Sequence, residues 1–430
     1  MNLILACETQ KILGHNLLSD NFGTQFYMRA KKDIVFVGLS YLMQKTLSLA
    51  ITQEDIDEAT AVLKERGQLD GFDMSRWQYI VDRYNGLLPI TIRSREEGEF
   101  VKARDVIMVV DIWDENVSWL SYHLDSMILR AIWYPSTLTT RLVELKSELK
   151  KWGSLNPLIT TDIAGRIAAT SEASTIMSAC VHTVFPNSDS LAGEEYLKRY
   201  YGHSSIKKKS IYETEHNIVM GWSSEDEYLE KLKRIKAGSA ITCLIDTYNK
   251  HHCLNILLSD SVMSLAAKRN ITMIVTPDSV ERAIETISVM RYMLAALDCK
   301  SSLPRHLKVT QNGLTVKTLR VLQKYTERHG IDPNNFVFTF EDNLLQDGIS
   351  RGTYGFEFKM CAQQDKAGWV GTQKKPRNDS DSWSLKGYQW SILLETRYIN
   401  GFTTYLPTLS DVRSNLATSL SDLARVISHK

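Results

Sequence analysis

Four short apolar runs in the chain each end at one or more carboxylate residues. Each run has the length of a buried strand, and a helical pattern of apolar positions follows most of them. The runs, with their acids, are Leu158–Asp162, Thr242–Asp246, Met273–Asp278 and Phe336–Asp342. A parallel α/β barrel presents polar groups in this way, at the C-terminal ends of its strands. The pattern therefore predicts chemistry at one end of a parallel sheet.

The same periodicity divides the chain into three segments. Residues 1–155 predict an N-terminal α+β domain, and residues 350–430 return to alternating strands that are expected to pack with it. Between them, residues 156–349 alternate strand with helix, as an α/β barrel-like domain does, with helices expected at 191–201, 247–258, 279–297 and 315–329. The predicted fold class is α/β, with a central parallel barrel-like domain packed with an α+β domain built from both terminal segments.

Local signals in the N-terminal segment place individual elements. Thr52–Asp55 has the pattern of a capping box at the start of a helix. Strands are expected at Ile90–Arg93 and Asp105–Ile112. An amphipathic helix is expected over Trp119–Trp133, ending at Tyr134-Pro135 because the residue before a proline avoids the α conformation.

Composition narrows the classes of partner and compartment. Fifty-one basic and fifty acidic residues leave a formal net charge of +1, so no overall field attracts nucleic acid or an anionic membrane. No run approaches the roughly 18 apolar residues of a membrane span, and the start lacks the basic region of a signal peptide. Six cysteines without a CxxC pair, mostly in apolar surroundings, indicate reduced thiols. We expect a cytoplasmic protein that binds neither nucleic acid nor membrane.

The candidate chemistry lies near the expected strand ends. Glu215-His216 could bring an imidazole, with a carboxylate beside it, to an anionic substrate, although a histidine with only a structural hydrogen bond is an equally good interpretation. Asp246 and Asp278 could orient a polyhydroxylated substrate or hold Mg²⁺ through water. They could equally be helix N-caps, because a helix is expected after each.

Two other polar clusters favour structural interpretations. His251-His252-Cys253 points its side chains in different directions on a helix and lacks a second pair of ligands, so we do not expect a metal site there. Arg29, Lys31 and Lys32 precede a strand, where a solvated strand edge is commoner than a phosphate site.

Short motifs along nearly the whole chain occur in a characteristic order. They are Trp77–Ile80, Gly86–Ile90, Trp133–Pro135, Asp189–Gly193, Lys198–Gly202, Glu215-His216, Ile245–Tyr248 and Pro277–Ser279. This order resembles that of the nicotinamide phosphoribosyltransferase family, including its bacterial and phage forms. The resemblance implies transfer of phosphoribosyl from phosphoribosyl pyrophosphate to nicotinamide with release of pyrophosphate, using Mg²⁺. It also implies a homodimer in which two subunits build each active site.

The resemblance assigns roles to individual residues. His216, beside Glu215, matches a catalytic histidine that ATP phosphorylates. Asp189 would accept a hydrogen bond from the carboxamide nitrogen of nicotinamide, and Arg166 would lie near the base. The acids of the two central strand ends, Asp246 and Asp278, would hold ribose hydroxyls or the metal-bound substrate. In this scheme Arg29 would reach phosphates across the dimer.

Several positions depart from the family pattern. Gln10 and Ile163 occupy the places of two aromatic residues that clamp the nicotinamide ring. Thr276 replaces an arginine, and Asn312–Leu314 replaces a Gly-Asp-Gly turn. Phe340–Asn343 replaces a run of glycines whose N–H groups approach the 5′-phosphate, and its two carboxylates would repel that phosphate.

Two functions follow from these matches and departures. The first is a diverged phosphoribosyltransferase of NAD salvage that acts on nicotinamide or a related base, with Mg²⁺ and ATP as cofactors. The second is a retired enzyme, without cofactors, whose fold serves a protein partner or an assembly. An open cavity in which His216, Asp189, Asp246 and Asp278 converge would favour the first. A filled cavity with Glu341 or Asp342 in the position of the phosphate would favour the second.

Overall fold

The computed structural model describes residues 2–18, 22–153, 159–185, 190–204, 210–278 and 282–428, and for 159–161 and 421–428 it describes the backbone alone. The chain forms two compact units. The first comprises Met1–Thr140, Arg199–His203 and Gly348–Lys430, and the second comprises Arg141–Lys198 and Ser204–Asp347. The domain boundaries expected after residues 155 and 349 stay predictions.

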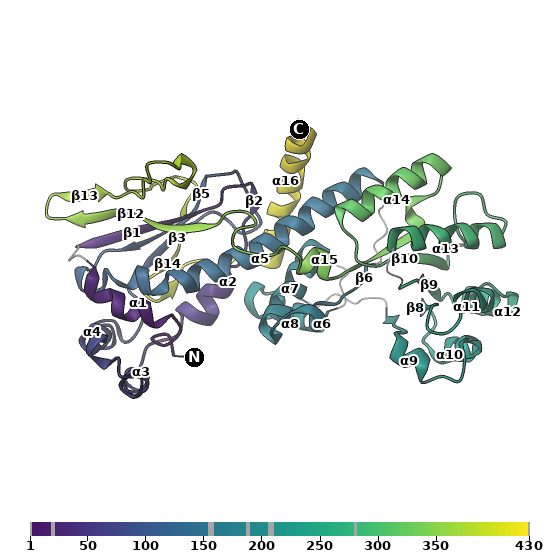
Figure 1. The fold of residues 1–430 in the computed structure, drawn as a ribbon, viewed down its shortest axis with the longest axis horizontal. Coiled ribbons are helices and arrows are strands. Elements are labelled where there is room, and N and C mark those ends of the chain that lie inside the picture. Colours follow the sequence, from purple (N-terminus) through teal and green to yellow (C-terminus); the bar gives the residue numbers. More distant parts are fainter. Residues whose placement is uncertain are drawn as a thin grey trace. The chain divides into compact units, whose positions relative to one another are not determined.

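An antiparallel sheet of seven strands forms the centre of the first unit (Figure 1). N-terminal and C-terminal segments of the chain alternate within it, since β1 pairs with β12 on one side and with β5 on the other. In spatial order the strands are β13 (Gly368–Gly371), β12 (Glu357–Asp365), β1 (Gly23–Arg29), β5 (Val106–Ile112), β3 (Thr91–Ser94), β14 (Glu395–Ile399) and β15 (Phe402–Thr403). A second, two-stranded sheet pairs β2 (Ile34–Val35) with β4 (Phe100–Val101).

Helices of the first unit bury apolar side chains with this sheet. Phe26, Met28 and Val110 of the sheet share one core with Trp77 and Ile128 of the helices. Burial of a large apolar side chain contributes about 1.5–3 kcal/mol, so this core is the main source of the unit's stability. The helices are α1 (Thr9–Gly14), α2 (Leu39–Leu42), α3 (Gln53–Glu65), α4 (Met74–Tyr84), the N-terminal part of α5 (Leu120–Lys151) and α16 (Leu409–Ser428).

The capping box expected at Thr52–Asp55 is confirmed. The Thr52 hydroxyl accepts from the backbone N–H of Asp55 at 3.2 Å, and the Asp55 carboxylate accepts from the backbone N–H of Thr52 at 2.9 Å. The two side chains thus satisfy backbone donors that the first turn of α3 leaves free.

The helix expected to end at Tyr134-Pro135 continues, and that prediction is wrong. Helix α5 runs through Pro135 to Lys151. Proline cannot donate to the carbonyl of Ala131, four residues earlier, and its ring crowds that carbonyl. Gly38 packs against the place where this occurs, since a Cβ at position 38 would lie 2.4 Å from the Ala131 oxygen and 2.7 Å from Pro135 Cγ. A glycine from another segment therefore leaves room for the turn that contains Pro135.

Side-chain hydroxyls hold the helix beyond the proline. The Ser136 hydroxyl accepts from the N–H of Val37 at 3.1 Å, and the Thr140 hydroxyl accepts from the N–H of Val35 at 2.9 Å. Both bonds are buried, where an unsatisfied backbone donor would cost about 1–3 kcal/mol. Tertiary contacts of this kind outweigh the local preference of proline to end a helix.

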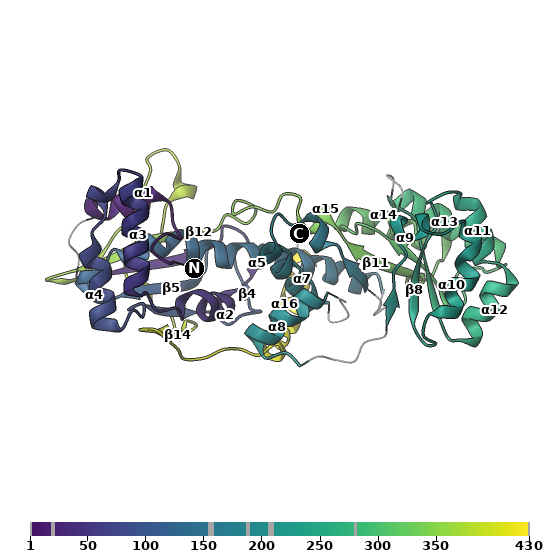
Figure 2. The ribbon, with the colours of Figure 1, turned by 90° about the horizontal axis from the view of Figure 1, so that it is seen from below.

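A parallel sheet of six strands forms the centre of the second unit (Figure 2). The sheet is curled into a half-barrel. Its edge strands β6 and β7 each pair with one inner neighbour in the part of the chain that the structure describes, so the barrel is open there. In spatial order the strands are β6 (Ile159–Asp162), β11 (Phe336–Phe340), β10 (Leu307–Gln311), β9 (Thr272–Thr276), β8 (Ala240–Leu244) and β7 (Ile211–Tyr212). The predicted mixed α/β class with a parallel sheet is confirmed at this level.

Most crossovers between these strands are helical. The expected helix at 279–297 is α13, whose described part is Arg282–Ala296, and the expected helices at 191–201 and 315–329 are α8 and α14. The expected helix at 247–258 is α11, which α12 follows. The remaining bounds are α6 (Ala164–Ile167), α7 (Ser171–Val184), α8 (Leu191–Tyr201), α9 (His216–Met220), α10 (Tyr228–Arg234), α11 (Lys250–Leu257), α12 (Asp260–Lys268), α14 (Val316–His329) and α15 (Asp342–Leu345).

All four predicted strands with terminal acids are present. Asp162 is the last residue of β6, Glu341 follows β11 directly, and Asp246 and Asp278 each lie two residues beyond β8 and β9. The six cysteines are free thiols. Within the described residues, no helix is long and apolar enough to cross a membrane.

Candidate active site

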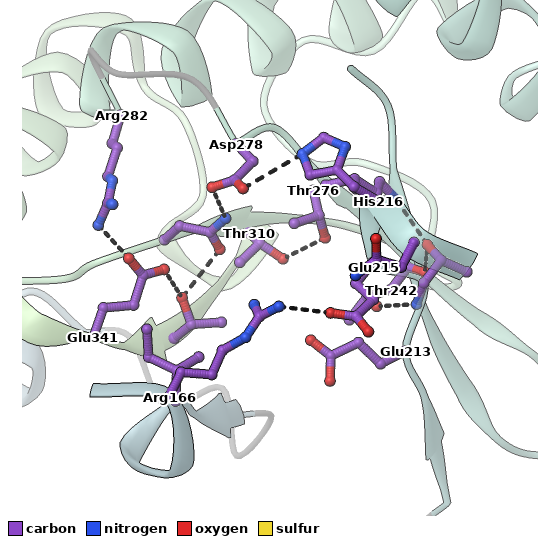
Figure 3. A pocket seen from close by; sticks show the side chains of 16 residues that line it. Arg166, Glu213, Glu215, His216, Thr242, Thr276, Asp278, Arg282, Thr310 and Glu341 are labelled. Carbon is purple, nitrogen blue, oxygen red and sulfur yellow. Dashed lines mark hydrogen bonds and ion pairs between the residues drawn. The ribbon is translucent and has the colours of Figure 1, made fainter. Parts of the chain in front are cut away.

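A cavity of about 280 Å³ lies in the second unit, at the C-terminal ends of strands β7 to β11 (Figure 3). Parallel strands point their C-terminal ends toward the same edge of a sheet, so side chains far apart in sequence meet there. The charged residues and the histidine that line the cavity are Arg166, Glu213, Glu215, His216, Asp278, Arg282 and Glu341. Four carboxylates therefore face two guanidinium groups and one imidazole.

Five threonines, one from each strand or from the residues just after it, also line the cavity: Thr214, Thr242, Thr276, Thr310 and Thr339. All five are buried. Thr214 Oγ1 donates to the carbonyl of Thr242 at 2.7 Å, and the hydroxyl oxygens of Thr276 and Thr310 are 3.2 Å apart. β-Branched residues suit strands, and here their hydroxyls form a polar layer, which we call the threonine floor.

His216 begins the short helix α9, and both of its ring nitrogens face oxygen atoms. Nδ1 lies 3.0 Å from Thr247 Oγ1, and Nε2 lies 3.7 Å from Asp278 Oδ2. When the Thr247 hydroxyl donates to Nδ1, the ring proton is on Nε2, toward Asp278; when Nδ1 carries the proton and donates to Thr247, Nε2 has a free lone pair. Because 44% of the His216 side chain is exposed, Nε2 is open to a ligand. Glu215 does not contact the imidazole; it pairs with Arg166 instead.

The loop after β9 is held by side chains from neighbouring strands. Asp246 Oδ2 accepts from the backbone N–H of Asp278 at 2.8 Å. Asn312 Nδ2 donates to the carbonyl of Pro277 at 3.2 Å and lies 3.4 Å from Asp278 Oδ1. Asp246 therefore positions Asp278 from behind, while its own Oδ1 is buried and has no hydrogen-bond partner within the described ranges.

A second group of charges lies on another side of the cavity (Figure 3). Arg166 Nη2 lies 2.8 Å from Glu215 Oε2, with 68% and 41% of the two side chains exposed. An exposed pair of this kind contributes about 0–1 kcal/mol, so a ligand can displace it at little cost. Burial raises the pKa of the neighbouring Glu213, and repulsion by the Glu215 carboxylate adds to the effect.

Arg282 and Glu341 form the most buried ion pair of the cavity lining. Arg282 Nη1 donates to Glu341 Oε2, and 30% and 10% of the two side chains are exposed. The Thr339 hydroxyl lies 3.3 Å from Glu341 Oε1. Burial raises the pKa of Glu341, the Arg282 guanidinium opposes this rise, and the Asp278 carboxylate adds to it. Glu341 thus occupies part of the cavity without filling it.

The structure brings together most of the residues predicted from sequence. His216, Glu215, Arg166 and Asp278 line one cavity, and Asp246 supports it. Asp189 lies outside the described residues.

Arg29, which was expected to reach phosphates, lies in the first unit. Its guanidinium pairs with Glu357 and donates to the carbonyl of Trp383 at 2.6 Å, and the residue is buried. Of the two positions expected to lack an aromatic clamp, Ile163 lines the cavity and Gln10 lies in α1 of the first unit. The roles assigned to these residues stay predictions.

Sequence reasoning missed Glu213, Arg282 and the threonine floor. A threonine in or just after each successive strand is a signal that could have revealed the floor. Arg282 and Glu341 are 59 residues apart, and nothing in their local sequence indicates that they pair.

Known proteins resemble this chain in sequence and in fold. Residues 21–92 match the family model described as "Nicotinamide phosphoribosyltransferase, N-terminal domain". The nicotinamide phosphoribosyltransferase of Xanthomonas campestris pv. campestris is 25% identical over 390 residues, which are 84% of this chain and 81% of that protein. The protein of the same name from Mycoplasma genitalium is 20% identical over 337 residues, 70% of this chain and 71% of that one.

Two solved structures share the fold at low sequence identity. Human nicotinic acid phosphoribosyltransferase has a TM-score of 0.59 and 14% identity, and the alignment covers 96% of this chain and 92% of that one. Nicotinate-nucleotide pyrophosphorylase from Pyrococcus furiosus has a TM-score of 0.59 and 10% identity, with 98% of each chain covered. The fold is therefore of the phosphoribosyltransferase class. In sequence, the chain is similar to nicotinamide phosphoribosyltransferases over most of its length.

Proposed function

We propose that this protein transfers the phosphoribosyl group of phosphoribosyl pyrophosphate to nicotinamide or a related base, as an enzyme of NAD salvage. One observation carries the proposal: an open cavity at the strand ends is lined by His216, Asp278 and Arg166, which come from separate elements. The relatives that match most of the chain carry the name of this activity.

The reaction forms one bond and breaks another at C1 of the ribose. The ring nitrogen of the base bonds to C1 with its lone pair, and the bond from C1 to pyrophosphate breaks, with its electron pair leaving on the pyrophosphate oxygen. Positive charge develops on the ribose and then on the base. Carboxylates fixed in a partly buried cavity stabilise such charge. Glu213 and Glu215 are placed for this task.

Asp278 is the proposed contact for ribose hydroxyls. Its carboxylate borders the cavity and accepts hydrogen bonds, and Asp246 and Asn312 restrain its backbone and side chain. A restrained acceptor loses little conformational entropy when the sugar binds. Arg166 can turn from Glu215 to an anionic or polar group of the ligand because its present pair is exposed.

His216 is the proposed acceptor of a phosphoryl group from ATP. In the tautomer that carries the proton on Nδ1, this nitrogen donates to Thr247 Oγ1, and Nε2 keeps its lone pair and faces the cavity. Nε2 would then attack the γ-phosphorus of ATP, and the bond to the ADP oxygen would break with ADP as the leaving group. The resulting phosphohistidine would carry the energy of ATP into the overall reaction. Thr247, 3.0 Å from Nδ1, would hold the ring in this orientation.

Mg²⁺ fits this cavity only with help from the ligand. Among the described residues, no group of three or more His, Cys, Asp or Glu side chains could hold a metal ion. Asp278 lines the cavity and its side chain is 41% exposed, so this carboxylate suits an ion that takes its other ligands from phosphates and water. Mg²⁺ bound in this way would neutralise the charge of pyrophosphate.

The retired-enzyme alternative is not favoured. A filled cavity would have supported it, whereas the cavity is open and is lined by His216 and Asp278. The homodimer, the cytoplasmic location and the packing of a barrel-like domain with an α+β domain remain proposals from the resemblance. So do the roles of Asp189 and Arg29.

The test is formation of the mononucleotide from purified protein, nicotinamide, phosphoribosyl pyrophosphate, Mg²⁺ and ATP, followed by chromatography. We expect product from the wild-type protein and a loss of at least about a hundredfold in Asp278→Asn, because a placed charge in an active site contributes that much. Calorimetric titration with phosphoribosyl pyrophosphate and Mg²⁺ complements the assay. Absence of both product and binding would contradict the proposal.

A further inference from the structure

Arg282 is a cation of the cavity wall whose charge is already neutralised within the protein. Its guanidinium pairs with Glu341, and the two side chains come from the start of α13 and from the residue after β11. Figure 3 shows the pair at the edge of the cavity, apart from the Arg166–Glu215 pair. An anion that enters the cavity must compete with Glu341 for Arg282.

The chain leaves room for this ion pair. Gly313 has a φ of +57°, and a Cβ at that position would lie 2.0 Å from Arg282 Nη1 and 3.0 Å from Asn343 Oδ1. Any larger residue would push the guanidinium away. Asn343 Oδ1 is itself buried and has no hydrogen-bond partner within the described ranges. The arginine is therefore seated in a defined place beside an acceptor that is still unused.

The Arg282–Glu341 pair is harder to displace than the other cavity pair. The Glu341 side chain is 10% exposed, whereas that of Glu215 is 41% exposed. When a buried carboxylate loses its cationic partner, the free-energy cost of removing it from water is no longer offset by the ion pair. Asp278 and Asp342 add repulsion to an unpaired Glu341. Glu341 therefore holds Arg282 firmly, while Glu215 yields Arg166 readily.

We propose that Glu341 is a specificity-determining residue that competes with the phosphate groups of the substrate for Arg282. The inference rests on the proposed function, which supplies a phosphorylated sugar as the ligand. The cavity of the wild-type protein then binds phosphate and pyrophosphate groups more weakly than it would if Arg282 were not paired with Glu341. It selects ligands through the base and the ribose hydroxyls to a correspondingly greater extent.

The experiment is calorimetric titration of inorganic pyrophosphate and of phosphoribosyl pyrophosphate, each with Mg²⁺, into four proteins. They are the wild type, Glu341→Gln, Arg282→Gln/Glu341→Gln and Glu285→Gln. We expect Glu341→Gln to bind both ligands about tenfold more tightly, the effect of one charge-assisted hydrogen bond. The double variant should lose this gain, because the guanidinium that provides it is gone.

Glu285→Gln is the matched control for net charge. Glu285 lies on the same helix as Arg282 and pairs with Lys250 at 2.5 Å, and neither residue of that pair lines the cavity. The control should bind both ligands as the wild type does. Equal tightening in Glu285→Gln and Glu341→Gln would show a general effect of charge and overturn the proposal. Unchanged or weaker binding in a folded Glu341→Gln would also overturn it, and Glu341→Ala provides the same test should the glutamine variant fail to fold.

These outcomes separate the inference from the proposed function. Product formation by the wild type together with no tightening in Glu341→Gln would contradict the inference alone. Tightening of pyrophosphate in Glu341→Gln, with no product from either protein, would support the competition and contradict the proposed function.

Discussion

His216 Nε2 lies 3.7 Å from a carboxylate oxygen of Asp278, which is beyond hydrogen-bonding distance but within reach of electrostatic attraction. The imidazole is fixed more tightly on its other side, where Nδ1 lies 3.0 Å from Thr247 Oγ1. This arrangement orients the ring and leaves Nε2 available.

Replacing His216 should separate catalysis from stability. We expect His216→Ala to remove the stimulation of product formation by ATP. Its melting temperature should change by less than about 2 °C, because a half-exposed side chain makes few contacts that stabilise the fold. The control is His252→Ala, since His252 is also about half exposed and pairs with Asp226 outside the cavity lining. Stimulation by ATP that persists in folded His216→Ala would refute this role.

Asp246 should act through Asp278. In Asp246→Ala the backbone N–H of Asp278 loses its acceptor at 2.8 Å, and the loop after β9 loosens. We expect kcat/KM to fall by about tenfold, as for loss of one hydrogen bond to a charged group. Asp246→Asn keeps an acceptor oxygen and should retain most of that activity. Steady-state kinetics of both variants test this, and equal losses would argue for a direct role of the Asp246 charge.

Glu213 should make the protein less stable as the pH rises. Burial raises its pKa above the ordinary value of 4.5, so the folded state binds this proton more tightly than the unfolded state does. The protonated group therefore favours folding at low pH, and this contribution is lost as the pH rises from 4.5 through the raised pKa. Glu213→Gln should be more stable than the wild type at pH 7 and equally stable at pH 4.

Urea unfolding of both proteins between pH 4 and pH 8 measures this difference. The exposed Glu230, which pairs with Lys233, provides a control, since Glu230→Gln should leave the dependence on pH nearly unchanged. A difference between wild type and Glu213→Gln that grows toward low pH would have the wrong sign for a buried carboxyl.

Gly38 should be intolerant of any side chain. Its φ of +109° is strained for other residues, and a Cβ would lie 2.4 Å from the carbonyl oxygen of Ala131. We expect Gly38→Ala to lower the free energy of unfolding by more than about 2 kcal/mol, since strain of this kind costs about 1–3 kcal/mol before the clash is counted. Gly67→Ala is the control, because Gly67 has a φ of +66° and nothing within 4 Å of its added Cβ. Similar losses in the two variants, measured by urea unfolding, would show that the clash is relieved.

The sequence predicted the strand ends of the site because local patterns encode them. Apolar runs of strand length followed by an acid located β6, β8, β9 and β11. Strand β10 was not singled out, because it ends at Gln311 instead of a carboxylate. The helix through Pro135 was mispredicted for a different reason. The glycine that accommodates it lies nearly one hundred residues earlier in the chain, and local rules do not include such contacts.

Local sequence patterns could not predict which charged residues, far apart in the chain, form ion pairs. Phe340–Asn343 was recognised as carrying carboxylates where glycines were expected, yet Glu341 could not be matched to Arg282. In the same way, Glu215-His216 predicted a carboxylate next to an imidazole, but the Glu215 side chain turns to Arg166. Side chains of adjacent residues at the start of a helix can point in different directions. The sequence therefore predicted which types of residue form the site, but not which of them pair with one another.

The threonine floor satisfies many of its own hydrogen bonds. Thr214 donates to the carbonyl of Thr242, and the hydroxyls of Thr276 and Thr310 face each other. Such a surface is polar, but its hydroxyls do not need a particular ligand group to complete their hydrogen bonds. Natural variation or directed evolution can therefore exchange the residues at the rim, where His216, Arg166 and Glu341 lie, and alter the accepted substrate without rebuilding the sheet beneath it.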